Sequence, residues 1–585
     1  ALPQVGTTLL DPPNLSSSNG VLALTLTLIS DSRRGSTALC GAYLATVDGK
    51  VRALSVPPTL NVKQGERLSI TLINALMPPF GGVETPPPIE IHGDASQENP
   101  YALMCGQPQL APTPTPDPVT GRIYGYHRSP WNEANLHFHG LNTSPKAPGD
   151  DVTDVLLCPH VASAPETYHY VVDIPRDEPP GTYWYHPHAH GESLYQMFLG
   201  LTGAIVVHSA QPSVPDRLPN RIAIVRDLPA RPGFSKYANI ARAQRATGVP
   251  DFRRNPGGDP FQSPDHCPSQ GSLRIQTDYL TVNGLQLPLD GNSLFGLPEA
   301  KIDAGETQYW RVANTAANTT LDVVLLVNGK PSPLLVTSRD GVPLVVKNGK
   351  PTYQPVAMEH VFLMPAARFE FYLTGATPGA EMVVRTRTVD TGCIGDVDLE
   401  RDLFHVKVGT KRTDQRFSLP PVTDSTRQRF SDLASQVPTR KRTFVLTEYA
   451  RSDEPEPDFY ITETSNPKAV EHPYRMAGRP DTIVKDGTVE EWTILNYTNE
   501  IHAFHIHQIH FLPTAGIDVA EGLNQLLDTV VVPHGGYDMS RKFVPGAVKL
   551  NMDFRDRNIV GTFVYHCHIM EHEDAGMMAR IQVVR

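Results

Sequence analysis

Short runs of apolar and β-branched residues alternate with turn-forming residues along the whole chain. Examples are residues 21–29, 69–73, 168–173 and 201–208, and clusters of Gly, Pro, Asn and Asp separate such runs. Runs of this length with turn residues between them are typical of β-strands rather than of helices. The pattern therefore predicts an all-β protein built from β-sandwiches.

The set of predicted strands recurs three times. Polar stretches with Pro at 209–220 and 410–441 separate the sets and have the composition of linkers. We therefore expect three sandwich domains, at 1–215, 216–415 and 416–585. The Pro-rich segment 78–130 is an insertion in the first domain, which could be a functional lid or an inert loop.

Length and composition exclude several classes of protein. A chain of 585 residues is too long for one small domain, and 55 Pro with 44 Gly argue against a coiled coil or a helical solenoid. The net charge is −11 and the basic residues are scattered, which argues against nucleic acid as a partner. No run approaches the roughly 20 apolar residues of a membrane-spanning helix.

The cysteines bear on the compartment. Cys567 lies within a histidine motif, and the other five can form up to two disulfides, which suits an oxidising environment. The chain begins at Ala1, as it would after removal of a signal peptide or after trimming. We expect a secreted or periplasmic protein. The five cysteines are Cys40, Cys105, Cys158, Cys267 and Cys393.

Histidine carries the candidate chemistry, because eight of the 22 His residues form four His-x-His pairs. Side chains alternate along a β-strand, so both imidazoles of a pair project from the same face. One isolated pair is usually two ordinary histidines, but four pairs predict a shared metal centre. Nitrogen ligands favour copper, which stands highest in the divalent affinity order. The pairs are His137/His139, His186/His188, His505/His507 and His566/His568.

The last pair has Cys567 between its two histidines. Alternation sends the sulfur to the face opposite the imidazoles, so one strand can contact two metal sites back to back. His572 and Met577 follow closely, and with one more His they would make a blue-copper site of two nitrogens, a thiolate and a weak thioether. Taken alone, Cys567 and Met577 would be ordinary core residues. Their spacing from His572 favours the ligand interpretation.

These motifs resemble those of the multicopper oxidases, the laccase-like family of three cupredoxin domains. Two departures are Ala503, where the family usually has Pro, and the insertion before His137. The first should affect loop stiffness more than ligation, and the second leaves the substrate surface open. The matching segments are HFHG at 137–140, GTYWYHPH at 181–188, HAFHIH at 502–507, and 566–578.

The resemblance implies four coppers per chain and a ligand for each motif position, with no ligand from the second domain. Cys567, His502 and His572 would hold the type 1 copper, with Met577 axial. His137 and His505 would hold the type 2 copper. The type 3 pair would take His139, His186, His188, His507, His566 and His568. His190 and His510 fall outside this set and are expected to support ligands or to lie at the surface.

The resemblance also implies the reaction. Four one-electron oxidations at the type 1 copper would send electrons through Cys567 to His566 or His568, and one dioxygen would be reduced to two waters. Glu573 matches an acid that relays protons in bacterial members. Asp150 matches a second one, with Asp151 and Asp154 as close competitors for that role. Each of these carboxylates could instead be a solvated surface group.

Phenols and aromatic amines are the expected donors, although some relatives oxidise Cu(I), Fe(II) or Mn(II). The 12 Met residues form no Met-rich insertion, which favours organic donors. An axial Met577 favours Cu(II) and hence a low to middling reduction potential. We expect a monomer. A copper nitrite reductase, a metal-free cupredoxin and a copper carrier are alternatives, which the complete ligand set and the position of Cys567 disfavour.

Overall fold

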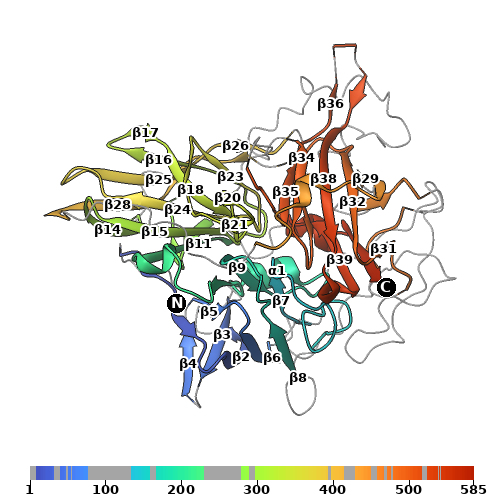
Figure 1. Cartoon of the computed structure of the whole chain (residues 1–585), viewed down its shortest axis with the longest axis horizontal. Coiled ribbons are helices and arrows are strands. Elements are labelled where there is room, and N and C mark those ends of the chain that lie inside the picture. Colours follow the sequence, from blue (N-terminus) through green and yellow to red (C-terminus); the bar gives the residue numbers. More distant parts are fainter. Residues whose placement is uncertain are drawn as a thin grey trace.

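The computed structural model of this protein consists almost entirely of β-strands (Figure 1). The insertion at 78–130 and four of the five cysteines considered for disulfides lie outside the residues that it describes. The role of the insertion and the formation of disulfides therefore remain predictions. The described residues are 8–31, 40–47, 50–54, 56–76, 133–157, 166–228, 279–288, 297–392, 395, 397–413, 428–449, 458–466, 471–475, 478–516, 523–537, 539–540 and 542–585.

The first sandwich consists of two five-stranded sheets, in the orders β4-β3-β2-β6-β8 and β1-β5-β10-β9-β7. Buried and partly exposed positions alternate along β6, which is the period expected when one face of a strand packs on a core. The strands are β1 (Asn14–Ser16), β2 (Val21–Asp31), β3 (Cys40–Val47), β4 (Lys50–Leu54), β5 (Thr59–Lys63), β6 (Arg67–Ala75), β7 (His137–His139), β8 (Glu166–Asp173), β9 (Gly181–His186) and β10 (Gly203–His208).

The second sandwich has an eight-stranded sheet facing a six-stranded sheet. Leu9 from the start of the described chain packs into its core, and the Leu9 amide donates to the Glu299 carbonyl at 2.7 Å. The large sheet contains β11 (Asn220–Leu228), β12 (Tyr279–Val282), β13 (Leu285–Gln286), β15 (Thr307–Asn314), β18 (Leu334–Arg339), β19 (Val342–Pro343), β22 (Val356–Met358) and β24 (Arg368–Thr374). The other contains β14 (Glu299–Ala304), β16 (Leu321–Val327), β17 (Lys330–Ser332), β23 (Val361–Leu363), β25 (Glu381–Arg387) and β28 (Arg401–Arg412).

The third sandwich again pairs two five-stranded sheets, and its core is built around Trp492 and Phe444. One sheet contains β29 (Arg440–Tyr449), β30 (Asp458–Glu463), β32 (Thr488–Asn496), β34 (Phe511–Ala515) and β38 (Gly546–Phe554). The other contains β31 (Thr482–Lys485), β33 (His502–Ile506), β35 (Thr529–Val532), β39 (Gly561–Cys567) and β40 (Met578–Val584).

A few short elements complete the described chain. The two-stranded pairs are β20 (Val346–Lys347) with β21 (Lys350–Pro351), β26 (Val389–Asp390) with β27 (Val397–Asp398), and β36 (Gly536–Tyr537) with β37 (Phe543–Val544). The helices are α1 (Ser193–Phe198), α3 (Met570–Asp574) and the 3₁₀ turns η2 (Pro215–Arg217), η5 (Leu433–Ser435) and η6 (Arg557–Ile559).

The three sandwiches meet near α1 and β9, which lie at the centre of the molecule (Figure 1). A small apolar cluster joins them there: Trp184 of β9 and Met197 of α1 pack with Ala317 and Ala366 of the second sandwich and with Met570 of α3. Each sandwich also has a hydrophobic core of its own. The predicted all-β class and the three sandwiches are thereby confirmed.

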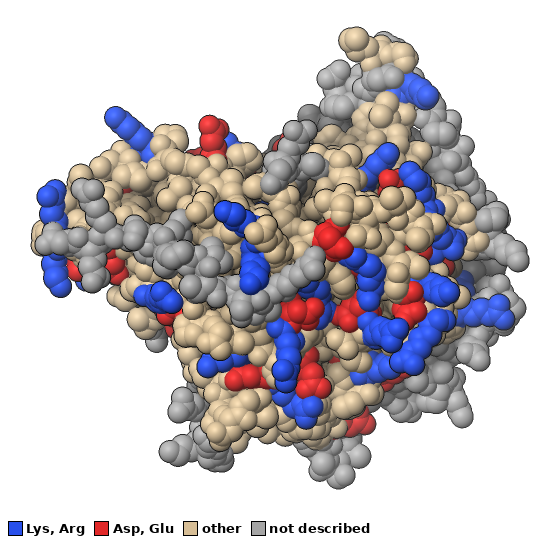
Figure 2. Space-filling model, viewed as in Figure 1, with Lys and Arg blue, Asp and Glu red and all other residues tan. Residues whose placement is uncertain are grey.

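The surface shows little segregation of charge on the face drawn in Figure 2, where basic and acidic side chains lie intermixed. Within the described part of the chain, none of the helices has the length and hydrophobicity that crossing a membrane requires.

Candidate metal centre

The four His-x-His pairs lie at the ends of four strands that pair two by two. Strand β7 runs antiparallel to β9, with His137 opposite His186, and β33 runs antiparallel to β39, with His505 opposite His566. The first two pairs belong to the first sandwich and the other two to the third. All eight imidazoles are buried, and the structure brings them together from the two sandwiches.

Within this assembly the ring nitrogens form three groups in which the candidate ligand atoms all lie within 4.8 Å of one another. Each group combines imidazoles from the first and third sandwiches. The groups are His137/His139/His505, His139/His186/His568 and His188/His507/His566.

Several of these rings have one nitrogen within hydrogen-bond distance of an acceptor oxygen, while the other nitrogen has no hydrogen-bond partner among the described residues. Nδ1 of His137 lies 2.9 Å from the Asp150 carboxylate, and Nδ1 of His505 lies 2.7 Å from the Asp528 carbonyl oxygen. His139 uses its other nitrogen, because Nε2 lies 3.2 Å from the Asp528 carboxylate. Oxygens of this kind accept hydrogen bonds, so each contact fixes the N–H on that nitrogen and leaves the opposite nitrogen with its lone pair.

The lone-pair nitrogens are Nε2 of His137 and His505 and Nδ1 of His139, and they have no hydrogen-bond partner among the described residues. Nε2 of His186 and both ring nitrogens of His568 also have no hydrogen-bond partner in the described part of the chain. Buried polar atoms are rarely left without a partner, because their desolvation then goes uncompensated. Metal ions would satisfy these nitrogens, and imidazole donors suit copper.

The protonation state of the rings agrees with metal binding. Burial, reinforced by the neighbouring imidazoles, lowers the pKa of His188 to about 4. The other affected rings have a pKa well below the ordinary 6.5 for the same reason, so all are neutral at pH 7 and can donate a lone pair. They are His137, His139, His186, His505, His507 and His568.

On the other side of β39, Cys567 forms a fourth group with His502 and His572. The sulfur lies 3.6 Å from Nδ1 of His502 and 3.5 Å from Nδ1 of His572, and these two nitrogens are 3.0 Å apart. Thr498 Oγ1 contacts Nε2 of His502 at 2.8 Å, and Glu500 lies 3.2 Å from Nε2 of His572. Both rings therefore direct Nδ1 toward the sulfur.

The segment after β39 completes this group. The His572 carbonyl accepts from the Met577 amide at 2.8 Å, and the Met577 carbonyl accepts from the Cys567 amide at 3.0 Å. Met577 is fully buried, and the ring of Phe459 stacks on His572 with 4.2 Å between centroids. Burial raises the pKa of the Cys567 thiol to about 12, so a metal that binds there must displace the proton.

Of the three candidate aspartates, Asp150 is the one that contacts a ring of the imidazole groups. It also accepts from the Phe138 amide at 3.0 Å and from Gln508 at 2.5 Å, and burial raises its pKa to about 7. Asp151 instead accepts from the amides of Thr153 and Asp154. Asp150 is buried, so it is not a solvated surface carboxylate.

Glu573 is also fully buried, and it lies between two imidazoles. Its carboxylate is 3.1 Å from Nδ1 of His566 and 3.6 Å from Nδ1 of His188. Burial alone would raise the pKa of Glu573, but these two rings outweigh it and lower the pKa. The adjacent Asp574 accepts from the Gly191 amide at 2.8 Å and has a raised pKa because it is buried.

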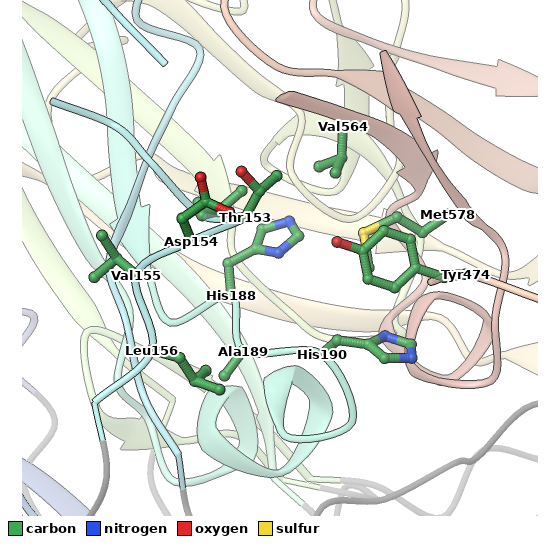
Figure 3. A pocket seen from close by; sticks show the side chains of 11 residues that line it. Thr153, Asp154, Val155, Leu156, His188, Ala189, His190, Tyr474, Val564 and Met578 are labelled. Carbon is green, nitrogen blue, oxygen red and sulfur yellow. The ribbon is translucent and has the colours of Figure 1, made fainter. Parts of the chain in front are cut away.

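His190 and His510 also lie inside the protein, so the expectation that they could be surface residues is wrong. Nε2 of His510 donates to the Asp340 carbonyl at 3.0 Å. The ring of His190 lies 4.8 Å from that of Tyr474, and both line a cavity of about 150 Å³ beside His188 (Figure 3). In this view the Tyr474 hydroxyl points toward the part of the cavity that His188 lines.

Three further residues that contact the candidate ligands, directly or through one neighbour, were not predicted from the sequence. They are Asp528, which contacts His139 and His505; Glu500, which contacts His572; and Arg368, which pairs with Asp528. None of them belongs to a recognisable motif. Asp528 is 389 residues from His139, so no local spacing could have revealed the contact.

The fold consists of three β-sandwiches, and its buried imidazole groups lie next to a cysteine that is flanked by two further imidazoles. This combination is typical of a copper protein of the cupredoxin class. Two family models, both described as multicopper oxidase, match residues 129–212 and 450–585. The two matched segments contain all of the candidate copper ligands, and they support a multicopper oxidase, which is an oxidoreductase.

The relatives are distant along most of the chain. A laccase of Bacillus subtilis (strain 168) is 23% identical over 444 residues, covering 72% of each chain. The multicopper oxidase LPR1 homolog 1 of Oryza sativa subsp. japonica is 23% identical over 463 residues, covering 72% of this chain and 69% of the relative.

Solved structures share the fold over nearly the full length. A multicopper oxidase from Campylobacter jejuni, described as a metallo-oxidase, has a TM-score of 0.62 at 18% identity and covers 99% of this chain and 95% of its own. A laccase-like multicopper oxidase from an Ochrobactrum species has a TM-score of 0.58 at 19% identity, with coverages of 98% and 100%. These similarities confirm the cupredoxin-like character of the sandwiches.

Proposed function

We propose that the protein is a laccase-like oxidase that couples four one-electron oxidations of phenolic or aromatic amine donors to the reduction of dioxygen to two waters. The position of Cys567 carries this proposal. Its sulfur joins His502 and His572, while the residues on either side of it, His566 and His568, join two separate imidazole groups. One peptide unit separates Cys567 from each of these two histidines. The proposed donor site would thus be linked covalently to a second centre.

The ligand assignment follows the groups of ring nitrogens. Cys567, His502 and His572 would hold the type 1 copper, with Met577 as the axial ligand. The group of His139, His186 and His568 and the group of His188, His507 and His566 each supply three nitrogens, which suits one type 3 copper apiece. His137 and His505 would then hold the type 2 copper.

Copper in these sites would supply one-electron redox chemistry and bind dioxygen. The chain itself must deliver protons, and two buried carboxyls are placed for this. Glu573 lies against His188 and His566, and Asp150 lies against His137. The cavity beside His188 is the approach that we propose for dioxygen, because it reaches a ring of one three-imidazole group.

A metal ion is a second candidate donor, and one observation favours it. The Glu500 carboxylate lies 3.2 Å from Nε2 of His572, at the end of the ring that faces away from the sulfur. An anionic oxygen there could attract a cation such as Fe(II), Mn(II) or Cu(I). The Campylobacter jejuni relative is described as a metallo-oxidase.

The test is an absorption spectrum of the copper-loaded protein, followed by oxygen uptake in the same cuvette. We expect an intense blue band from the Cu(II)–thiolate site and oxygen consumption without peroxide when a phenol is added. A colourless protein that still binds copper would contradict the proposal. Oxygen uptake with Fe(II), Mn(II) or Cu(I) and none with phenols would assign the second donor class.

A further inference from the structure

The guanidinium of Arg368, at the start of β24 in the second sandwich, lies fully buried where the three sandwiches meet. It donates to both oxygens of Asp528 of the third sandwich at 2.8 Å each. Its Nε also donates to the carbonyl of Thr182 in the first sandwich at 3.1 Å, and its Nη1 to that of Ala366 at 3.1 Å. One side chain thus makes hydrogen bonds to all three sandwiches.

The partner of Arg368 is the residue that orients two imidazoles. The carboxylate of Asp528 lies 3.2 Å from Nε2 of His139, and its carbonyl oxygen lies 2.7 Å from Nδ1 of His505. These contacts determine which nitrogen of each ring carries the proton, so that Nδ1 of His139 and Nε2 of His505 keep their lone pairs. The two rings stack with 3.9 Å between centroids.

Asp528 is itself held by several neighbours. Oδ1 accepts from the Thr529 hydroxyl at 2.9 Å, and Asp340 of the second sandwich accepts from the Asp528 amide at 3.3 Å. Oδ2 also lies 3.6 Å from Nε2 of His510. Arg368 is nevertheless the only cation that forks onto both carboxylate oxygens among the described residues. A bidentate pair of this kind fixes the carboxylate plane as well as its position.

We propose that Arg368 is a positioning residue for the imidazole-held copper, acting through Asp528 on His139 and His505. The second sandwich supplies none of the proposed ligands, yet through this one side chain it sets the orientation and tautomer of a ring from each of the other two. The inference rests on the proposed function, because it takes His139 and His505 to be copper ligands.

The experiment compares copper retention in Arg368→Lys and in the wild type. Lys keeps the positive charge but cannot hold both oxygens of Asp528 together with the Thr182 carbonyl. Copper-loaded proteins are titrated with EDTA, and we follow the copper content, the blue band, and the electron paramagnetic resonance signal of copper that lacks a thiolate. Loss of such supporting contacts typically weakens metal affinity about 10- to 100-fold. We expect that loss for the imidazole-held copper, with the blue band retained.

The matched control is Arg442→Lys, which alters another buried arginine with a fork onto a carboxylate. Its hydrogen bonds go to Glu490, Glu463 and the Ile483 carbonyl. We expect it to retain copper as the wild type does. If Arg368→Lys fails to fold, Asp528→Asn provides the same test, because it keeps the volume and removes the charge.

Three results would overturn the inference: wild-type copper retention and an unchanged resonance signal in Arg368→Lys, parallel loss of the blue band, or equal copper loss in Arg442→Lys. A wild-type protein without a blue band would be a different failure. It would overturn the proposed function, and this inference with it.

Discussion

Single hydrogen bonds decide what the ring nitrogens and the sulfur of this centre can do. Asp150 determines which nitrogen of His137 carries the proton, and Asp528 does the same for His139. At Cys567 burial raises the pKa of the thiol to about 12, while hydrogen bonds from the amides of Ile569 and Ala503 oppose the rise by favouring the thiolate. Changes of one atom at these places should alter the metal chemistry more than the fold.

Replacement of Cys567 by Ser tests the thiolate. We expect Cys567→Ser to lose the blue band and to reduce oxygen uptake with phenols to background, because a hydroxyl does not replace the thiolate. The free energy of unfolding should change by only about 1 kcal/mol, the usual size for a single substitution. Absorption spectra, oxygen uptake and thermal unfolding measure these effects. Blue absorbance that survives the substitution would contradict the assignment.

Ala503→Pro removes the N–H that donates to Cys567, at the position where multicopper oxidases usually have Pro. A hydrogen bond to the sulfur withdraws charge from it, so its loss should stabilise Cu(II) and lower the reduction potential. A contribution of about 1 kcal/mol corresponds to roughly 40 mV for one electron. A redox titration of the blue band measures the shift, and Ala503→Gly, which retains the N–H, should leave the potential near the wild-type value. An unchanged potential in Ala503→Pro would show that this N–H does not tune the site.

At the scale of elements, strand alternation and one tight turn arrange the centre. Strand β39 directs His566 to one face and Cys567 to the other, so one strand serves two sites. After β7 the chain must turn at Gly140, whose φ of +85° is left-handed. A Cβ at Gly140 would lie 2.6 Å from both Arg368 Nη2 and Asp528 Oδ2. Only glycine leaves room for that ion pair directly behind His139.

Gly140→Ala should therefore do more than strain the backbone. The left-handed conformation costs about 1–2 kcal/mol for a residue with a Cβ, and displacement of the ion pair adds to this and should release imidazole-held copper. Gly20→Ala is the matched control, because Gly20 has a φ of +82° with nothing within 4 Å of the added Cβ. Thermal unfolding and copper content of both variants separate the two effects. Equal losses in the two proteins would contradict the role of the close contact.

At the scale of the whole molecule, buried polar groups join segments that are distant in the sequence. Arg429, from the segment that precedes the third sandwich, pairs with Asp177 of the first sandwich and Asp556 of the third. Next to this junction Glu178 is fully buried, and Asn142 donates to it at 2.8 Å. Burial raises the pKa of Glu178 from 4.5 to about 7.

This shift predicts a pH dependence of stability. Between about pH 4.5 and pH 7 the folded protein keeps a proton on Glu178 that the unfolded chain releases, so this group lowers the stability as the pH rises. Glu178→Gln cannot ionise and should lose that component. Relative to the wild type, it should gain up to about 3 kcal/mol between pH 4.5 and pH 8. Thermal unfolding of both proteins across this range is the measurement, and parallel pH profiles would contradict the prediction.

Local patterns along the chain are enough to predict the class of the fold and most of the candidate ligands. Period-two alternation predicts strands, makes both rings of a His-x-His pair share a face, and places Cys567 opposite His566 and His568. Spacing also singled out His572 and Met577. The three imidazole groups consist of rings from the four pairs, and His572 joins Cys567 in the fourth group, whereas His502 was assigned through the family resemblance.

Which pairs meet, and which side chains hold them in place, depends on the tertiary structure. The choice among Asp150, Asp151 and Asp154, and the contacts of Asp528 and Arg368, depend on strands that come together from different sandwiches. Such contacts follow from the packing of whole sheets, and a carboxylate or guanidinium carries no mark of its partner in the local sequence.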